Sequence, residues 1–311
     1  MEGARSSEPV RVAAHAKVNL RLRVLGRGED GYHALETLFL RLALRDEVEI
    51  RTGSRGIRLQ VEREPGPVTG LREPQRPVPA GPENLCWMAA EAYYGALGRE
   101  PNVDLLLRKR LPAGAGLGGG SADAAAVLRG LEALHEGALG DAGLQGIAGG
   151  LGSDVPFHLA DTEAALGWER GRRLLPLAAP AARPLLVVVP GFRVATPEAY
   201  AWLDEEREGD GAGAGAPDET AFLFPPAGRL GRWEELAELA VNDFEAPVFA
   251  RHPELRGWKE ALLGAGARPA LLAGSGSALF GVFPDEETRD AGAARLEAED
   301  GVAVIRTRGP V

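Results

Sequence analysis

Glycine dominates the segment Leu111-Pro-Ala-Gly-Ala-Gly-Leu-Gly-Gly-Gly-Ser-Ala-Asp123, which runs directly into the alanine-rich stretch 124–134. Five of the seven residues 114–120 are glycines. Because glycine adopts positive φ readily, consecutive backbone N–H groups can point into one concave space. The alanine-rich stretch favours a helix, which Ser121 or Asp123 could cap. A glycine loop that leads into a helix N-terminus predicts a phosphate site, because unpaired N–H groups and the helix dipole favour an anion.

The segment 103–111 before this loop has the composition of a strand, so the predicted unit is strand, phosphate loop and helix. A flexible glycine linker is the alternative. It is disfavoured because linkers mix glycine with serine or proline and do not join a strand to a long helix.

Two common nucleotide motifs fit this loop poorly. The P-loop requires Gly-Lys-Ser/Thr at its end, and this tripeptide does not occur in the sequence. A dinucleotide fingerprint matches formally at Gly114, Gly116 and Gly119. However, it lacks an evident following strand with a ribose-binding acid about 20 residues further on.

Composition sets broad limits on the class of protein. The chain has 311 residues, 45% of them hydrophobic, which predicts two domains of ordinary size. A net charge of −10 argues against nucleic-acid and membrane-surface partners. The single cysteine, Cys86, suits a reducing cytoplasm, and the N-terminal residues 1–9 are interpreted as a short disordered leader without the apolar core of a signal peptide. We therefore expect a cytoplasmic protein.

Hydrophobic patterning predicts the remaining elements. The expected strands are a half-buried one at 11–25 and others at 32–40, 46–51, 168–173, 185–189 and 302–306, with a strand–turn–strand unit at 271–283. The expected helices are 83–94 (ending at Gly95 or Gly98), 233–240, 254–263 and 286–298. We place a domain boundary near 165–185, giving domains 1–175 and 176–311, with a proline-rich loop at 65–82 and a mobile insertion at 208–219.

Lysine is scarce in this chain. Only Lys17, Lys109 and Lys259 occur among 35 basic residues. A compact, movable ammonium is retained where arginine cannot replace it, and Lys17 lies in an apolar strand. Lys17 is therefore the first candidate for a functional role, whereas the charged surroundings of Lys109 and Lys259 fit surface lysines.

Other polar residues remain ambiguous from the sequence. Asp154, just before a proline-containing turn, is either a general base or a turn or capping residue. Asn84 either caps a helix or contacts a nucleotide. The histidines at 135, 158 and 252 are scattered, and no metal-ligand spacing is evident.

The loop resembles the second motif of the GHMP kinases, Pro-x-x-x-Gly-Leu-Gly-Ser/Gly-Ser/Gly-Ser. Further blocks are similar to the branch that phosphorylates a cytidine-diphosphate-linked methylerythritol in the non-mevalonate isoprenoid (isopentenyl diphosphate) pathway; they are 14–20, 31–39, 151–156, 190–200, 242–245 and 273–277. Departures are modest: His15 replaces the usual proline, Ser153 replaces the usual alanine, and residues 208–219 are an insertion. The resemblance implies an α+β, two-domain GHMP kinase fold, with an N-terminal ribosomal-protein-S5-domain-2-like domain and a C-terminal ferredoxin-like α/β sandwich domain.

The resemblance also implies an ATP-dependent kinase that uses Mg²⁺. Asp154 would be the general base, and Lys17 is expected beside it to keep its carboxylate ionised. Ser121 would lie near the phosphates or Mg²⁺, and Asp123 would cap the helix. The expected ATP-binding residues are Asn84 and the loop Pro112, Ala113, Gly114, Ala115, Gly116, Leu117, Gly118, Gly119, Gly120, Ser121 and Ala122.

For the alcohol substrate, the resemblance points to Tyr32, His33 and Tyr200. Two aromatic faces can sandwich a cytosine while an imidazole or backbone group reads its edge. Asn19 shares a strand face with Lys17 and is expected to bind the polyol. Thr196 and the turn at Gly274 and Ser275 complete the expected substrate site.

Two other functions remain open at this point. One is another small-alcohol kinase of the family, which the Tyr32-His33 segment disfavours. The other is a non-catalytic binding module, because the N-terminal topology also occurs in RNA-associated proteins. The acidic balance and the combination of Lys17, the loop and Asp154 argue against that module. The expected partner is a small molecule, with no nucleic acid or membrane, and the chain is expected to be a monomer or homodimer.

Overall fold

A computed structural model describes residues 8–28, 32–53, 55–64, 78–169, 171, 173–209 and 230–311. Its first sheet has the order β3-β4-β2-β1-β8, with β5 and β6 attached to one end of β2. These strands are β1 (Val10–Arg27), β2 (His33–Thr52), β3 (Gly56–Arg63), β4 (Asn102–Lys109), β5 (Ala164–Glu169), β6 (Arg173–Leu177) and β8 (Val241–Asn242). The long strand β2 pairs with β1 along its length, with β5 at its start and with β4 at its end.

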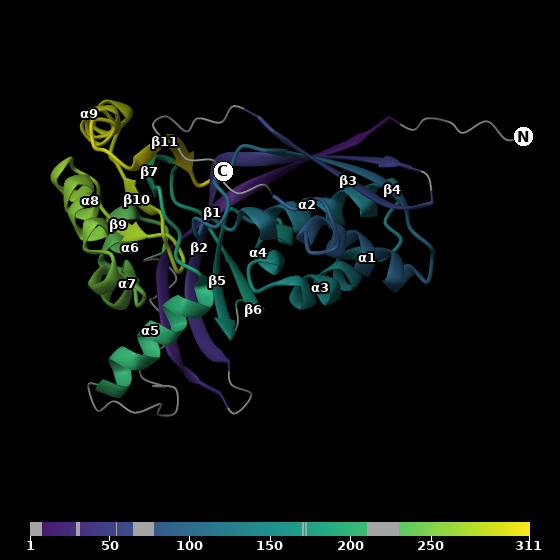
Figure 1. The fold of residues 1–311 in the computed structure, drawn as a ribbon, viewed down its shortest axis with the longest axis horizontal. Helices are drawn as coiled ribbons and strands as arrows, with labels where there is room; N and C mark the ends of the chain where they lie inside the picture. Colours follow the sequence, from purple (N-terminus) through teal and green to yellow (C-terminus); the bar gives the residue numbers. More distant parts are fainter. Residues whose placement is uncertain are drawn as a thin grey trace, which may run out of the picture.

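Helices cover one face of this sheet (Figure 1). They are α1 (Leu85–Leu97), α2 (Gly119–Leu134), α3 (Gly140–Leu151) and the short α4 (Val155–Leu159). Their small and apolar side chains share a core with the sheet, as in the contact of Gly130 with Ile50, where an added Cβ would approach the isoleucine to 1.9 Å. The glycine loop therefore begins at the end of a central strand and leads into α2, in which Ala122–Leu128 are all buried.

The second sheet has the order β11-β7-β10-β9, and its neighbouring strands are antiparallel. It consists of β7 (Arg183–Pro190), β9 (Ala270–Leu272), β10 (Leu279–Val282) and β11 (Val302–Gly309). The helices of this half are α5 (Thr196–Gly209), α6 (Trp233–Leu239), α7 (Glu245–Arg251), α8 (Pro253–Gly264) and α9 (Glu286–Leu296). In Figure 1 α7, α8 and α9 lie on the side of the molecule opposite to α1 and α3.

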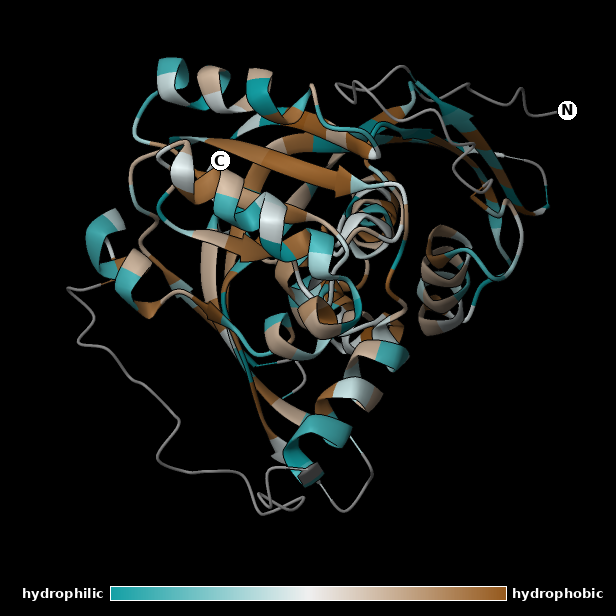
Figure 2. Ribbon diagram, turned by 60° about the vertical axis from the view of Figure 1, so that its left-hand side comes forward, coloured by the Kyte–Doolittle hydropathy of each residue, from teal (hydrophilic) through white to brown (hydrophobic). Residues whose placement is uncertain are grey.

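The two sheets share a hydrophobic core. Val18 and Leu20 of β1 pack in the same cluster as Val187 of β7 and Phe280 of β10. Figure 2 shows the apolar colour concentrated on the strands. The expectation of a half-buried first strand was wrong, because the second sheet covers the apolar face of β1 while Lys17 and Asn19 on its other face are also buried.

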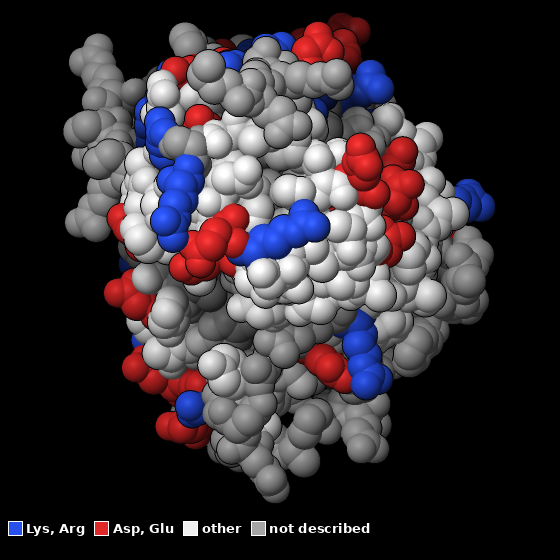
Figure 3. All heavy atoms as spheres, turned by 90° about the vertical axis from the view of Figure 1, so that its right-hand side faces the viewer, with Lys and Arg blue, Asp and Glu red and all other residues white. Residues whose placement is uncertain are grey.

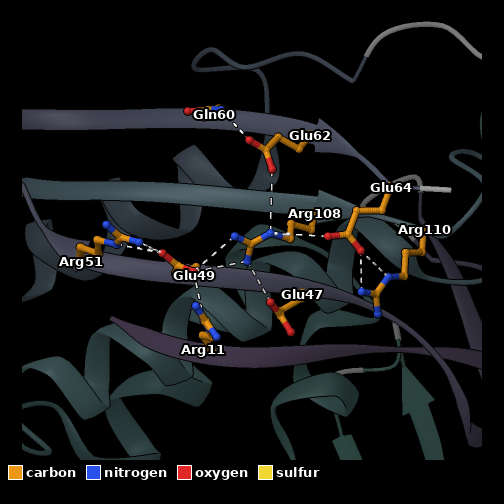
Figure 4. A network of polar contacts seen from close by, with 9 residues as sticks. All are labelled: Arg11, Glu47, Glu49, Arg51, Gln60, Glu62, Glu64, Arg108 and Arg110. Carbon is orange, nitrogen blue, oxygen red and sulfur yellow. Dashed lines mark hydrogen bonds and ion pairs between the residues drawn. The ribbon is translucent and has the colours of Figure 1, made fainter. Parts of the chain in front are cut away.

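A network of charged side chains lies on the face of the first sheet opposite to the helices (Figure 4). The carboxylate of Glu49 is 1% exposed and pairs with Arg11, Arg51 and Arg108, of which Arg11 Nε lies 3.1 Å away. The Arg51 hydrogen bond, with those of Arg11 and Arg108, lowers the pKa of Glu49. The network shows how a strand face rich in arginine and glutamate is accommodated without an apolar partner.

Several predicted elements need correction. Residues 46–51 are not a separate strand but the end of β2, which runs without a break from His33. The segment 168–173 is not one strand, because β5 ends at Glu169 and β6 begins at Arg173. Strand β3 and helices α3, α4, α5 and α7 were not predicted. The 271–283 hairpin, helices α1, α8 and α9, and the C-cap at Gly98 agree with the predictions.

The chain changes sheet between β6, which ends at Leu177, and β7, which begins at Arg183. However, β8 returns to the first sheet and pairs in parallel with β1 at Leu22 and Asn242. The boundary between 175 and 176 therefore stays a prediction. The N-terminal leader as far as residue 7, most of the 65–82 loop and most of the 208–219 insertion lie outside the described residues.

The described surface mixes charges of both signs. Figure 3 shows acidic and basic side chains interspersed with neutral ones on one face. Among the described residues, no helix combines the length and the apolar character needed to cross a bilayer.

Candidate active site

The glycine loop has the alternating backbone conformation expected of an anion cradle. Gly114, Gly116 and Gly118 have φ values of 72°, 81° and 72°, in the left-handed region that favours glycine. Gly118 is the N-cap of α2, and no side chain caps this helix. The expectation that Ser121 or Asp123 caps the helix was therefore wrong, because the helix begins at Gly119, before both residues.

Both halves of the protein hold the loop in place. The carbonyl of Leu117 accepts a 3.0 Å hydrogen bond from Lys17 N on β1, and the carbonyl of Ala115 accepts one of 3.3 Å from Ala278 N. A Cβ at Gly116 would lie 1.9 Å from the carbonyl oxygen of Ala273. Glycine is required at 116 by this close approach as well as by its φ.

The loop forms one wall of a cavity of about 630 Å³ that lies between the two halves of the chain. Nearly all the predicted site residues line it, namely Lys17, Asn19, Asn84, Pro112 to Ser121, Asp154, Thr196, Tyr200, Gly274 and Ser275. Ala122, Tyr32 and His33 were predicted too but are not among the lining residues. Ala122 is 2% exposed and packs in the core between α2 and the sheet.

Lys17 lies beside Asp154, as predicted. Its Nζ is 3.2 Å from Asp154 Oδ2, 2.8 Å from Asn19 Oδ1 and 3.2 Å from the carbonyl oxygen of Gly116. The lysine side chain is 4% exposed, and the aspartate side chain is 28% exposed. The ion pair places the ammonium against the carboxylate while leaving the carboxylate accessible from the cavity.

Asn19 is held by a chain of hydrogen bonds behind this pair. Its Nδ2 donates to Thr37 Oγ1 over 2.7 Å, and the threonine hydroxyl donates to the carbonyl of Arg21 over 2.9 Å. These contacts fix the amide so that Oδ1 accepts from Lys17. The orientation of the lysine is therefore set from β1 and β2 together.

Lys109 belongs to a buried charged cluster with Asp46 and Asp123. Its Nζ pairs with Asp46 and lies 2.7 Å from Asp123 Oδ2. Asp46 Oδ1 accepts hydrogen bonds from the backbone N–H groups of Arg110 and Leu111, at 2.5 and 2.8 Å. The interpretation of Lys109 as a surface lysine was therefore wrong, since the cluster ties the strand before the loop to the helix after it.

The second carboxylate oxygen of Asp123 has no hydrogen-bond partner within the described part of the chain. Burial raises the pKa of Asp123 to about 7. Lys259, the other lysine interpreted as a surface residue, is 22% exposed and pairs with Glu245 over 2.5 Å.

His158 is buried behind the catalytic candidates. An added Cβ at Gly118 would lie 2.8 Å from His158 Nε2 and 2.9 Å from Cγ of Lys17. Burial lowers the pKa of His158 to about 3, with Asp154 opposing the shift and Lys17 adding to it. Its Nε2 lacks a hydrogen-bond partner among the residues described, so the imidazole is a neutral packing group there.

At another end of the cavity, Tyr200 of α5 meets His33 of β2. Their rings stack with centroids 4.7 Å apart, and Phe244 packs edge-on against Tyr200 at 4.9 Å. Tyr32 is 60% exposed. The ring stacked on Tyr200 is therefore that of His33 and not that of Tyr32. Burial, with the nearby carboxylates of Asp154 and Asp204, raises the pKa of Tyr200 to about 12.

The remaining predicted residues also line the cavity. Thr196 Oγ1 lies 3.0 Å from Ser275 Oγ, which joins α5 to the turn between β9 and β10. Asn84 is the N-cap of α1 and accepts from Cys86 N over 2.8 Å, so the capping interpretation is confirmed while it also lines the cavity.

Several contributing residues were missed from the sequence. The buried Asn242 donates to the carbonyls of Leu272 and Gly274, at 2.8 and 2.7 Å, and so shapes the turn that carries Ser275. Thr37, Phe39, Lys109 and Phe244 also line the cavity. The scarcity of lysine was a signal that Lys109 has a specific role. Its partners Asp46 and Asp123 lie in distant segments, so the sequence did not show that it is buried.

A magnesium ion is the metal that the fold family implies. Within the described residues there is no group of three or more His, Cys, Asp or Glu side chains that could hold a metal. The hydroxyl of Ser121 and the carboxylate of Asp154 do line the cavity. Since Mg²⁺ keeps several waters and binds through few protein oxygens and the substrate phosphates, these residues fit the ion.

Comparisons with known proteins agree with this architecture. The family model for the GHMP kinases N terminal domain matches residues 84–166, and that for the GHMP kinases C terminal domain matches 226–302. A mevalonate kinase structure from Methanococcus jannaschii is 16% identical with a TM-score of 0.67, covers 98% of this chain and 99% of that one, and shares the fold.

Other relatives are much more similar. The 4-diphosphocytidyl-2-C-methyl-D-erythritol kinase of Anaeromyxobacter dehalogenans is 43% identical over 94% of this chain and 87% of its own length. That of Thermus thermophilus is 40% identical over 91% of each chain. A crystal structure of 4-(cytidine 5'-diphospho)-2C-methyl-D-erythritol kinase is 36% identical, with a TM-score of 0.73 over 96% of this chain and all of that one. The chain therefore belongs to the GHMP kinase family, and within it to the 4-diphosphocytidyl-2-C-methyl-D-erythritol kinases.

Proposed function

We propose that this protein transfers the γ-phosphate of ATP to the 2-hydroxyl of 4-diphosphocytidyl-2-C-methyl-D-erythritol, in the non-mevalonate isoprenoid pathway. The observation that carries the proposal is the Lys17–Asp154 pair, which faces the same cavity as the glycine loop. The family membership gives the substrate, and the geometry gives each group a role. We propose that the reaction takes place in the cytoplasm.

The loop would bind the triphosphate of ATP. Its glycines at positive φ form a concave backbone whose N–H groups can donate to phosphate oxygens, and the N-terminus of α2 adds a partial positive charge. The side chain of Asn84 and the hydroxyl of Ser121 line the cavity next to it. Positioning and charge stabilisation are the main tasks of an enzyme in phosphoryl transfer.

Asp154 would act as the general base. It takes the proton from the substrate hydroxyl, whose oxygen then bonds to the γ-phosphorus while the bond to the bridging β–γ oxygen breaks and ADP leaves. Lys17, whose ammonium lies beside the carboxylate, would stabilise the charge that develops on the reacting oxygens. Asn19 would hold the polyol beside them, with Thr196, Gly274 and Ser275 at the phosphate-bearing end.

Magnesium would be held through Ser121, with the carboxylate of Asp154 lining the same cavity. When bound, the ion neutralises charge on the transferring phosphate. The cytidine would bind near Tyr200, with His33 at the edge of the base and Tyr32 exposed beside it.

The direct test is ATP consumption with a panel of alcohols that includes the cytidine substrate, homoserine and mevalonate. Turnover confined to the cytidine-linked alcohol, with competition by CDP, is the expected result. Turnover of homoserine or mevalonate in its place would assign the chain to another activity of the same fold. Native mass spectrometry would show whether the chain is a monomer or homodimer.

A further inference from the structure

Asp204 makes a contact that joins the two halves of the protein at the rim of the cavity. His33 Nε2 lies 2.7 Å from Asp204 Oδ1. His33 begins β2, and Asp204 lies in α5, one helical turn after Tyr200. The imidazole is thus fixed on its face by Tyr200 and at its Nε2 edge by a carboxylate.

The strand geometry places His33 in line with the cavity. Side chains two residues apart on a strand share a face, so His33 lies on the same face of β2 as Leu35, Thr37 and Phe39, all of which line the cavity. The His33 side chain is 10% exposed, and Asp204 is 33% exposed. The imidazole therefore lies just beyond the lining residues, with its other edge available to a ligand.

The carboxylate determines which ring nitrogen carries the proton. A carboxylate only accepts hydrogen bonds, so the neutral imidazole must hold its proton on Nε2. Nδ1 is then an acceptor. Within the described part of the chain, Nδ1 has no hydrogen-bond partner, while Nε2 is engaged.

We infer that Asp204 is a specificity-determining residue, which holds Nδ1 of His33 as an acceptor for the amino group of a cytosine. The inference rests on the proposed function. Cytosine presents an amino donor where uracil presents a carbonyl acceptor. An acceptor at Nδ1 of His33 therefore favours a cytidine ligand. It opposes a uridine ligand, because the carbonyl oxygen of uracil would face the lone pair of Nδ1 with no hydrogen between them. Asp204 acts through His33 and is a positioning residue.

The test is to measure the dissociation constants of CDP and UDP by calorimetry, with a non-hydrolysable ATP analogue occupying the phosphate loop. The wild-type protein is expected to bind CDP at least about tenfold more tightly than UDP. In Asp204→Leu this ratio should fall about tenfold, toward equal binding, because leucine cannot accept a hydrogen bond and the proton is no longer held on Nε2. In Asp204→Asn the amide oxygen still accepts from Nε2, so most of the ratio should remain. Both variants change a partly exposed side chain, which favours normal folding.

Glu205→Gln is the matched control, because Glu205 neighbours Asp204 on α5 but pairs with Arg251. Its CDP to UDP ratio should equal that of the wild type. If Asp204 only anchors α5, Asp204→Leu will weaken both nucleotides equally, and the unchanged ratio overturns the inference. Equal binding of CDP and UDP by a wild-type enzyme that phosphorylates the cytidine substrate would overturn it as well, with the proposed function intact. Absence of both cytidine binding and turnover would refute the two proposals together.

Discussion

The ammonium nitrogen of Lys17 lies 3.2 Å from a carboxylate oxygen of Asp154 and 3.2 Å from the carbonyl oxygen of Gly116. Three distant segments therefore meet at one atom: strand β1, the glycine loop and the residue before α4. Because the contact with Gly116 places the glycine loop against the Lys17–Asp154 pair, it explains how a phosphate in the loop and an accepting hydroxyl would come together in the proposed reaction.

Lys17→Ala and Asp154→Asn should each lower kcat by about 10²- to 10⁴-fold, the usual contribution of a positioned acid or base. The variants should remain folded, which circular dichroism and thermal melts will check. Asp161→Asn is a suitable control, because this exposed aspartate does not line the cavity. A folded Asp154→Asn enzyme with near-normal turnover would remove Asp154 from the mechanism.

Gly116→Ala should raise the KM for ATP and destabilise the protein by roughly 1–3 kcal/mol, because the new methyl group would meet the carbonyl of Ala273 at a φ of 81°. Gly146→Ala provides the contrast. Gly146 lies in α3 with no neighbour within 4 Å, so alanine should stabilise the helix by up to about 1 kcal/mol. Urea unfolding and ATP kinetics on both variants measure the difference. Equal effects would show that the loop is not held by its contact with the second half.

Lys109→Met should destabilise the protein by about 3–5 kcal/mol, because it leaves Asp46 and Asp123 buried without their cation. Adding Asp46→Asn and Asp123→Asn should restore part of the loss. Lys259→Met removes the half-buried pair with Glu245 and should cost about 1 kcal/mol or less. If chemical denaturation gives the same loss for both lysines, the cluster does not stabilise the loop as described.

His158 should make the protein sensitive to acid. Its folded pKa of about 3 lies below the unfolded value of 6.5, so the unfolded chain binds the proton more readily between these values. The contribution of His158 to the free energy of unfolding is therefore fully present above pH 6.5. It is lost as the pH falls toward 3, by roughly 2–3 kcal/mol between pH 7 and 4.5.

The matched variant is His158→Leu, which has a similar volume and no titrating group. Its free energy of unfolding should fall less than that of the wild type over the same pH range, with the difference assigned to the imidazole. Parallel pH profiles for the two proteins would show that His158 titrates normally in the folded state.

The sequence alone determined the local chemistry of the loop and the family. Alternate glycines between a strand and an alanine-rich helix dictate a backbone that only glycine adopts, and this pattern is readable because it depends on neighbouring residues. Scarce lysine likewise directed attention to Lys17. The β9–β10 hairpin was also predictable from its turn, Gly274-Ser-Gly276, and α1 from the helical spacing of its apolar residues and the glycine at its end.

Only the tertiary structure decided which polar side chains meet. Lys109 was interpreted as exposed because its sequence neighbours are charged, yet its partners Asp46 and Asp123 come from β2 and α2. Asp204 gave no local signal at all, since its partner His33 lies in the other half of the chain. Burial and pairing depend on contacts between segments far apart in sequence, and such contacts leave no pattern in the residues next to either partner.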